Sequence, residues 1–310
     1  MLAANSEDRH ASPPLLRRRL GSELRRLREE AGLTRGEVAG HLYCSASKIS
    51  RLETGRVSVS PRDVKDMLNL YELTEEQTKA LHQLAGEARH GDDWWHSCRD
   101  VPDVRTYMSF ERASSSIWVF ESSAIPGLLQ SEGYARLIIR TLLPHLNDQE
   151  VARHVELRME RQRLLCDDCA PELQAVLDEA TVQRLIGMPE VMKDQIEHLQ
   201  SVARKSNVTI QVLPFTAGAH EGMDGAFTIL GFPHEADREV VFVELPAGEL
   251  YLDSEDHLRR YRRIFERLQA AALPTEDSIA LLTAIARNWE KISEQSCLQD
   301  GATEDRTLRT

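Results

Sequence analysis

The chain has 310 residues, of which 28% are charged and 41% are hydrophobic, and its formal net charge is −12 at pH 7. This length is sufficient for two domains, one small and one of nearly 200 residues. No run of about 18 apolar residues occurs, so we expect no membrane span. Residues 1–14 have no apolar core, which excludes a signal peptide and predicts a short disordered lead.

The net charge is distributed unevenly along the chain. Residues 15–56 contain ten Lys and Arg against five Asp and Glu, which gives this segment +5 and leaves −17 for the rest. A basic footprint on one module attracts DNA, and an acidic remainder limits nonspecific binding. The asymmetry is consistent with a DNA-binding regulator but does not establish one.

The chain contains five cysteines, and an odd number of cysteines fits a protein of the reducing cytoplasm. Cys166 and Cys169 form a CxxC pair, the one candidate metal or redox site in the sequence. A structural zinc site needs two more ligands at regular spacing, and neither Cys98 nor His154 supplies a second pair. We therefore favour a loop that holds two cysteines, and we expect a cytoplasmic protein with no metal and no cofactor.

Five short amphipathic helices are predicted near the N-terminus, at residues 15–31, 35–42, 46–54, 61–71 and 75–89. Thr34 and Glu37 form a capping box at the start of the second helix. Ser45 is suited to cap the third helix, and Gly55 to end it, because glycine tolerates left-handed geometry. Two short helices joined by a tight turn are the layout of a helix-turn-helix, whose second helix enters the DNA major groove.

A resemblance to the phage repressor/Cro-type helix-turn-helix, also called the xenobiotic-response-element type, is carried by LRRLREEAGLTRGEVAGHLYCSASKISRLETGR. It covers about residues 15 to 71 and includes PRDVKDMLNLY after the motif. The resemblance implies an all-α bundle of five helices, over residues 15–90, that binds double-stranded DNA. Tyr43 departs from the family pattern, because it occupies a turn position where glycine is common.

The resemblance also implies roles for single residues. Base-edge contacts fall at Ser45, Ala46, Ser47 and Arg51, and Arg51 is the best suited because arginine can bond to guanine O6 and N7. Ala46 has no hydrogen-bonding group and could read only a thymine methyl. Phosphate contacts fall at Arg35, Lys48, Arg56 and Arg62, and Ser50 lies on the same outward face of the recognition helix 46–54. The alternatives are a surface salt bridge for Arg51 and a solvated side chain for Lys48.

A second region follows a polar linker at residues 91–106, in which the adjacent Trp94 and Trp95 are expected to anchor the linker to the next domain. Strands are predicted at 172–179, 207–215, 225–232 and 239–245. Helices are predicted near 112–121, 131–141, 149–165, 181–186, 189–204, 255–272 and 276–292. The pattern predicts an α/β domain with a mixed sheet at 107–292, and a disordered tail at 293–310. The chain is thus predicted to be a multi-domain protein, with an all-α domain followed by an α/β domain.

This second region resembles the domain of unknown function that follows Cro-type modules in many actinobacterial regulators, of which WhiJ-like developmental regulators are familiar members. The similarity is carried by FESSAIPGLLQSEGYARLII, LDEATVQRLIG, VTIQVLPFTAGAHEGMDGAFTIL and ELYLDSEDHLRRYRRIF. It implies a cytoplasmic transcription factor that is commonly encoded beside a small partner protein. It implies no particular ligand.

Two segments are candidates for binding a small molecule. The first is the glycine-rich stretch AGAHEGMDGAF with His220, Glu221 and Asp224, for which a flexible hairpin loop is the alternative. The second holds Trp118 and Glu121 before the break at IPGLLQ, where core packing is the alternative. Trp95 either covers such a pocket or seals the domain junction.

Three functions are compatible with these patterns. We favour a homodimeric transcriptional regulator whose α/β domain binds a small-molecule effector or a protein and thereby shifts DNA binding. The second is the protein-interaction module of an antitoxin-like pair, with a small partner protein. The third is an enzyme that uses the His220 loop. No nucleophile elbow, P-loop or Rossmann fingerprint in the sequence supports this third function, so we expect that the protein is not an enzyme. The amphipathic helices at 255–272 and 276–292 are candidates for the dimer interface.

Overall fold

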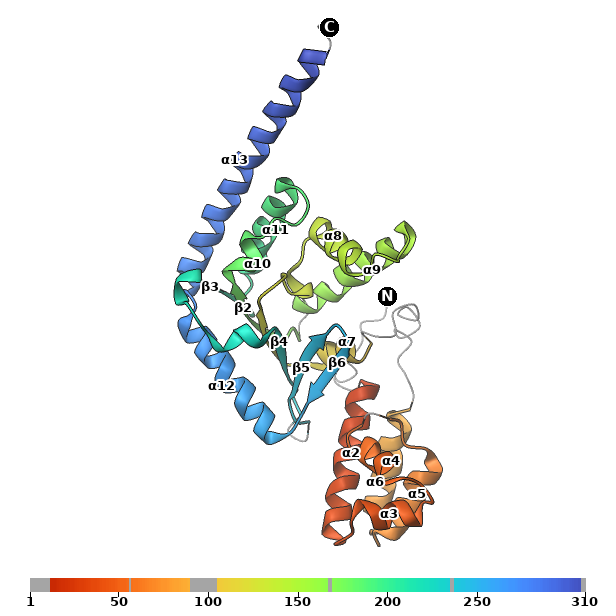
Figure 1. The fold of residues 1–310 in the computed structure, drawn as a ribbon. Coiled ribbons are helices and arrows are strands. Elements are labelled where there is room, and N and C mark those ends of the chain that lie inside the picture. The colour runs from red at the N-terminus through yellow and green to blue at the C-terminus, as the bar shows by residue number, and fades with distance from the viewer. Residues whose placement is uncertain (1–11, 56, 90–104, 167–168, 235–236, 308–310) are drawn as a thin grey trace. The chain divides into compact units, whose positions relative to one another are not determined.

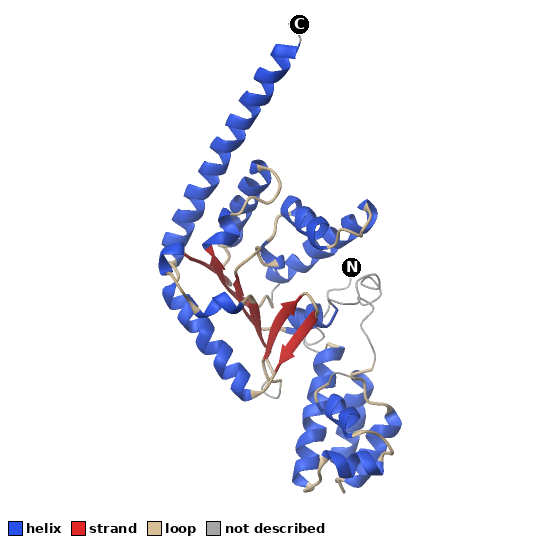
Figure 2. Cartoon of the chain, viewed as in Figure 1, coloured by secondary structure: helices blue, strands red, loops and turns tan. Residues whose placement is uncertain are grey.

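A computed structural model describes residues 12–55, 57–89, 105–166, 169–234 and 237–307. The packing of the chain defines two compact units, Met1–Ser114 with Gly231–Arg238 and Ser115–Leu230 with Glu239–Thr310. The order of the elements can be followed in Figure 1, and their type in Figure 2. This organisation, a helical region followed by a region with a mixed sheet, confirms the predicted fold class.

The first unit is built from helices. They are α2 (Pro13–Glu30), α3 (Arg35–His41), α4 (Ala46–Glu53), α5 (Pro61–Leu70), α6 (Glu75–Glu87) and α7 (Arg105–Ala113). The first five match the predicted helices to within two residues at each end. Helix α2 begins at Pro13, earlier than predicted, because proline suits the first helical turn, where its missing N–H would have no partner.

Caps and one glycine set the geometry of the helix-turn-helix. Thr34 and Glu37 make both bonds of the capping box, and the Ser45 hydroxyl accepts from the N–H of Lys48 at 3.1 Å. Helices α2 and α4 approach closely at Gly21, where a Cβ atom would lie 2.5 Å from the carbonyl oxygen of Leu52. No larger residue fits there without moving one helix.

The hydrophobic core of this bundle is contributed by every helix from α2 to α6. Its buried members include Leu20, Leu24, Val38, Ile49, Leu52, Val64, Met67 and Leu81. Burial at helical spacing on each element is what the amphipathic pattern predicted.

Two segments from outside the predicted DNA-binding region pack within the first unit. The carboxylate of Asp237 accepts from Arg19 of α2, at 2.9 Å from Nε and 2.6 Å from Nη2. Phe110 of α7 meets Phe232 edge-on at 5.9 Å, and the Arg18 guanidinium lies 5.5 Å from the centre of the Phe110 ring. These contacts place α7 and Gly231–Arg238 with α2, so the predicted boundaries at residues 90 and 107 do not coincide with the compact units.

The second unit contains a six-stranded sheet in the order β3-β2-β1-β4-β5-β6. The strands are β1 (Ser116–Glu121), β2 (Glu172–Asp178), β3 (Val208–Leu213), β4 (Phe227–Gly231), β5 (Val240–Leu245) and β6 (Gly248–Leu252). Strands β1, β2 and β3 are parallel, whereas β4, β5 and β6 form antiparallel pairs. The register aligns Val119 of β1 with Ala175 of β2, and Ala175 with Ile210 of β3.

Helices surround this sheet or pack on one another beside it. They are α8 (Glu132–Leu142), α9 (Asp148–Arg161), α10 (Glu179–Gln183), α11 (Pro189–Val202), α12 (Glu255–Ala271) and α13 (Thr275–Thr307). Helix α12 packs on the face that carries Trp118 and Phe120, through Phe265 and Leu268. Because side chains alternate along a strand, Glu121 points to the opposite face.

Three predictions for this unit were wrong. The predicted helix near 112–121 is mostly β1, a central strand covered on both faces, whose continuous apolar run hides the two-residue alternation. The edge strand β6 was not predicted, because its five half-exposed residues carry a weak pattern. The tail expected to be disordered at 293–310 is helical to Thr307, where it continues α13.

Candidate DNA interface and ligand cleft

The outward face of α4 has the small and basic character that a recognition helix needs. Ala46, Ser47 and Arg51 are exposed, and Ser50 is half-buried. Within the described part of the chain, Arg51 forms no ion pair. The surface salt bridge that was the alternative for this residue is therefore not present there. Its guanidinium is therefore available to an external acceptor.

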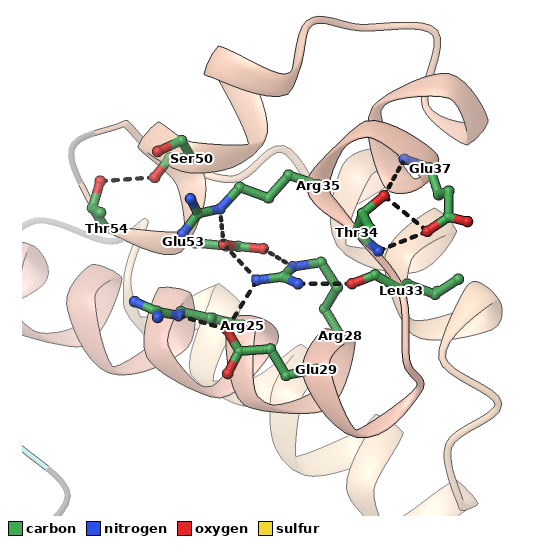
Figure 3. Close-up of polar contacts among 10 residues, drawn as sticks. All are labelled: Arg25, Arg28, Glu29, Leu33, Thr34, Arg35, Glu37, Ser50, Glu53 and Thr54. Carbon is green, nitrogen blue, oxygen red and sulfur yellow. Dashed lines mark hydrogen bonds and ion pairs between the residues drawn. The ribbon is translucent and has the colours of Figure 1, made fainter.

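A buried ion cluster holds α4 against its neighbours (Figure 3). The carboxylate of Glu53, with no exposed side-chain surface, accepts from Arg28 Nε at 2.5 Å and from Arg35 Nε at 2.8 Å. Arg28 also donates to the carbonyl oxygen of Leu33 at 2.7 Å. Since Arg28 lies on α2, Arg35 on α3 and Glu53 on α4, the cluster joins these three helices and fixes the orientation of α4.

The sequence analysis did not identify Arg28 or Glu53 as part of the site. The signal was present for Glu53, because it follows the buried Ile49 and Leu52 at positions i+4 and i+1 and so lies on their face of α4. A buried carboxylate requires a cation beside it. Because Arg28 and Arg35 are both distant from Glu53 in the sequence, the sequence alone did not show which cations these are.

Three of the predicted phosphate contacts are already paired within the bundle. Arg35 binds Glu53, the Lys48 ammonium lies 2.8 Å from Asp63, and Arg62 lies 3.8 Å from Asp66. Lys48 is thus neither simply solvated nor free. Arg56 lies outside the described residues.

Tyr43 has an unusual conformation in the turn between α3 and α4. Its φ angle is +50°, in the left-handed region that favours glycine, and its side chain is 98% exposed. Tyr43, which stands where glycine is common in the family, therefore has a backbone conformation that is energetically unfavourable for tyrosine.

The predicted ligand residues separate into two groups. His220, Glu221 and Asp224 line a cleft of about 440 Å³ whose other wall is α12. Trp118 does not line it, because its ring stacks on Phe265 at 5.5 Å, which is the core-packing alternative. Glu121 faces the other side of the sheet, and Trp95 lies outside the described residues.

The loop that carries His220 crosses the carboxyl ends of β1 and β2. The Nε2 atom of His220 lies 3.4 Å from the Asp178 carboxylate at the end of β2, and its ring meets Phe120 edge-on at 5.9 Å. A Cβ atom on Gly222 would lie 2.4 Å from the Phe120 ring, so the loop packs directly on β1. Ligands of open α/β sheets bind outside the carboxyl ends of the strands, which is where this cleft lies.

Glu121 is a carboxyl group in an unfavourable position. Burial raises its pKa from 4.5 to about 8, with a further contribution from the negative charge of Glu244. Between these two pH values the folded chain keeps a proton that the unfolded chain releases. The stability of the folded state must therefore fall as the pH rises from 4.5 to 8.

Replacement of Glu121 by glutamine should remove this loss. We expect Glu121→Gln to leave the free energy of unfolding unchanged near pH 4.5 and to raise it by roughly 2–4 kcal/mol at pH 8, after allowance for its partial exposure. Urea unfolding of both proteins at several pH values measures the difference, and Glu244→Gln, at an exposed position, should give a smaller change of the same sign. A difference that does not vary with pH would contradict the buried-carboxyl interpretation.

Cys166 of the CxxC pair is the last residue of a short 3-10 helix, Gln162–Cys166, and the two residues between Cys166 and Cys169 lie outside the described residues. Cys166 and Cys169 are exposed free cysteines, and Cys166 Sγ lies 2.7 Å from Lys205 Nζ. Among the residues that the structure describes, no three His, Cys, Asp or Glu side chains form a metal-binding group. The same residues include no helix that is both long and apolar enough to cross a membrane.

The fold and the exposed face of α4 define a helix-turn-helix protein, the class of DNA-binding regulators, with an added mixed α/β domain. Residues 19–81 match the family model described as a helix-turn-helix domain, and residues 104–284 match the domain of unknown function DUF5753. The chain therefore belongs to the DUF5753 family, in the arrangement that the two resemblances predicted. No curated protein and no solved structure matches the chain.

Proposed function

We propose that this protein is a sequence-specific transcriptional regulator that places α4 in the major groove of double-stranded DNA. The observation that carries the proposal is the exposed face of Ala46, Ser47 and Arg51 on a helix held by the buried Glu53 cluster. Pre-organised side chains on a rigid element can discriminate bases, because little ordering remains to be done on binding.

The residues around α4 have distinct parts in this proposal. Arg51 reads a base edge, and Ser45 and Ser47 lie beside it at the start of the helix, where base contacts of this motif concentrate. Arg62, 91% exposed at its side chain, contacts a phosphate with only a long 3.8 Å interaction to give up. Arg35 and Lys48 contribute mainly by orienting α3 and α4, since each is already held by a carboxylate.

The regulator acts as a homodimer in this proposal, because one such module reads only a half-site. The helices that the sequence suggested for the interface have other partners. Phe265 of α12 is buried against the sheet, and Leu282, Ile285 and Trp289 of α13 are buried while α13 packs on α11. The apolar faces of α12 and of the first half of α13 are thus covered within their own unit, and the predicted location of the interface is not supported.

In this proposal the protein acts in the cytoplasm, and its α/β domain modulates DNA binding by binding an effector. Coupling requires that the effector have different affinities for the DNA-binding and non-binding states. The cleft beside His220 is where such a molecule would bind.

Selection of bound fragments from sheared genomic DNA by the purified full-length chain tests the function. We expect enrichment of an inverted repeat whose half-sites lie about one helical turn apart, and a dimeric mass by light scattering on that DNA. Failure to enrich any fragment at moderate salt would contradict sequence-specific binding. A monomeric mass at micromolar concentration, with and without DNA, would contradict the homodimer.

A further inference from the structure

A basic cleft lies between the loop after β3 and helix α12. Four arginines of the helix line it, namely Arg259, Arg260, Arg263 and Arg267. Arg260, Arg263 and Arg267 recur at intervals of three and four residues and so share one face of the helix, and Arg259 lies four residues before Arg263 on the edge of that face. The cleft volume of about 440 Å³ is in the range of sites for small molecules.

The opposite wall of the cleft is anchored to the sheet. His220 is held between Asp178 and Phe120, and the phenyl ring of Phe120 packs against Gly222. Within the described residues, the buried Nδ1 of His220 has no hydrogen-bond partner. A wall fixed in this way gives the cleft a defined shape rather than that of a loose surface loop.

The charges of the four arginines are only partly neutralised. Two of them have partners: Arg259 binds Glu255 and Asp256 at 2.8 and 2.5 Å, and Arg267 binds Glu221 at 2.5 Å. Arg260 and Arg263 are exposed, and in the described part of the chain they form no ion pair. Like charges three and four residues apart repel each other on a helix, so an anion between them would be stabilising.

We propose that this cleft binds a small phosphorylated molecule, whose phosphate oxygens accept hydrogen bonds from Arg260 and Arg263. The planar guanidinium group matches two phosphate oxygens at once, and it remains charged at all physiological pH values. The carboxylates of Glu221, Asp224 and Asp256 also line the cleft, so the unpaired positive charge of the described cleft residues is confined to Arg260 and Arg263, which suits a small anion rather than an extended nucleic-acid backbone. Such a molecule would be the effector of the proposed regulator. Binding to the cleft does not depend on that proposed function; only the effect of binding on regulation rests on it.

Calorimetric titration of the full-length chain with inorganic pyrophosphate, in the absence of DNA, tests the site directly. We expect saturable binding with one equivalent per chain. The Arg260→Gln/Arg263→Gln variant should bind at least tenfold more weakly. The Arg287→Gln/Lys291→Gln variant, which removes the same charge from exposed positions of α13, should bind like the unchanged chain. Circular dichroism spectra establish that each variant is folded.

Two results would overturn the proposal: no saturable binding by the unchanged chain, or equal binding by the Arg260→Gln/Arg263→Gln variant. DNA binding by the same proteins separates this site from the proposed function. If the variant loses DNA affinity and its salt slope falls by about two without pyrophosphate, the two arginines contact DNA phosphates, and the proposal is wrong. If pyrophosphate binds as expected but no DNA is selected, the cleft stands and the DNA-binding function fails.

Discussion

Replacement of Glu53 by alanine should destabilise the helix-turn-helix unit by about 3–5 kcal/mol, because it removes the buried counter-ion of the Arg28 guanidinium and leaves only the longer 3.2 Å contact with the exposed Glu29. Arg28 is 7% exposed at its side chain, whereas Arg35 is 39% exposed and can turn to water. The loss should therefore arise mainly from Arg28. Hydrogen exchange of the full-length chain measures it, as a decrease in amide protection of about two to four orders of magnitude within α2–α6.

Two further variants sharpen this measurement. Glu53→Gln keeps the shape and one acceptor oxygen, so it should recover part of the loss but leave Arg35 without a negative partner and Arg28 with only the exposed Glu29. Glu30→Ala removes an exposed carboxylate that pairs with Arg26 on α2, and it should change protection by less than about 0.5 kcal/mol. An equal effect of Glu53→Ala and Glu30→Ala would show that burial of the cluster does not contribute to stability.

Replacement of Arg51 by alanine should weaken binding to the selected DNA by about 1–3 kcal/mol, or roughly fivefold to 150-fold, and relax the preference at one base pair. The reason is that Arg51 is exposed on α4 and has no ion pair among the described residues, so its hydrogen-bonding capacity is available to a guanine. Affinity for the full set of single-base variants of the operator, at two or more salt concentrations, measures both effects.

The pattern of loss distinguishes a base contact from a phosphate contact. Arg62→Ala should weaken binding to all sequences uniformly and reduce the salt slope by about one. Lys79→Ala removes a positive charge from an exposed position of α6 and should have little effect. If Arg51→Ala behaves like Arg62→Ala, Arg51 contacts the backbone and another residue of α4 reads the sequence.

The first five helices could be predicted closely because their determinants are local. The capping box of Thr34 and Glu37, the cap at Ser45 and the stop at Gly55 lie within a few residues of the helix ends that they define. Periodic apolar residues then identify the buried face of each helix. Strand β1 lacked such a signal, since its pairing with β2 joins residues more than 50 positions apart and its burial on both faces removes the alternation.

The candidate sites were predicted in part. The outward face of α4 followed from helical spacing, and the glycines around His220 marked the loop that lines the cleft. The sequence did not predict that Glu53 would bind Arg28 and Arg35, nor that Trp118 would pack on Phe265 rather than line a pocket. These outcomes depend on which distant side chains meet, and no local pattern contains that information.

The sequence by itself determined that the chain has a helix-turn-helix module, whose second helix has a basic outward face, and a separate α/β region. It could do so because caps, periodicity and charge act between near neighbours. The tertiary structure alone decided that α12 places Arg260 and Arg263 opposite the His220 loop, about 40 residues away in the chain. It also decided that α7 and Gly231–Arg238 pack with α2. The physical reason is that such long-range contacts depend on how whole elements pack, which no short segment specifies.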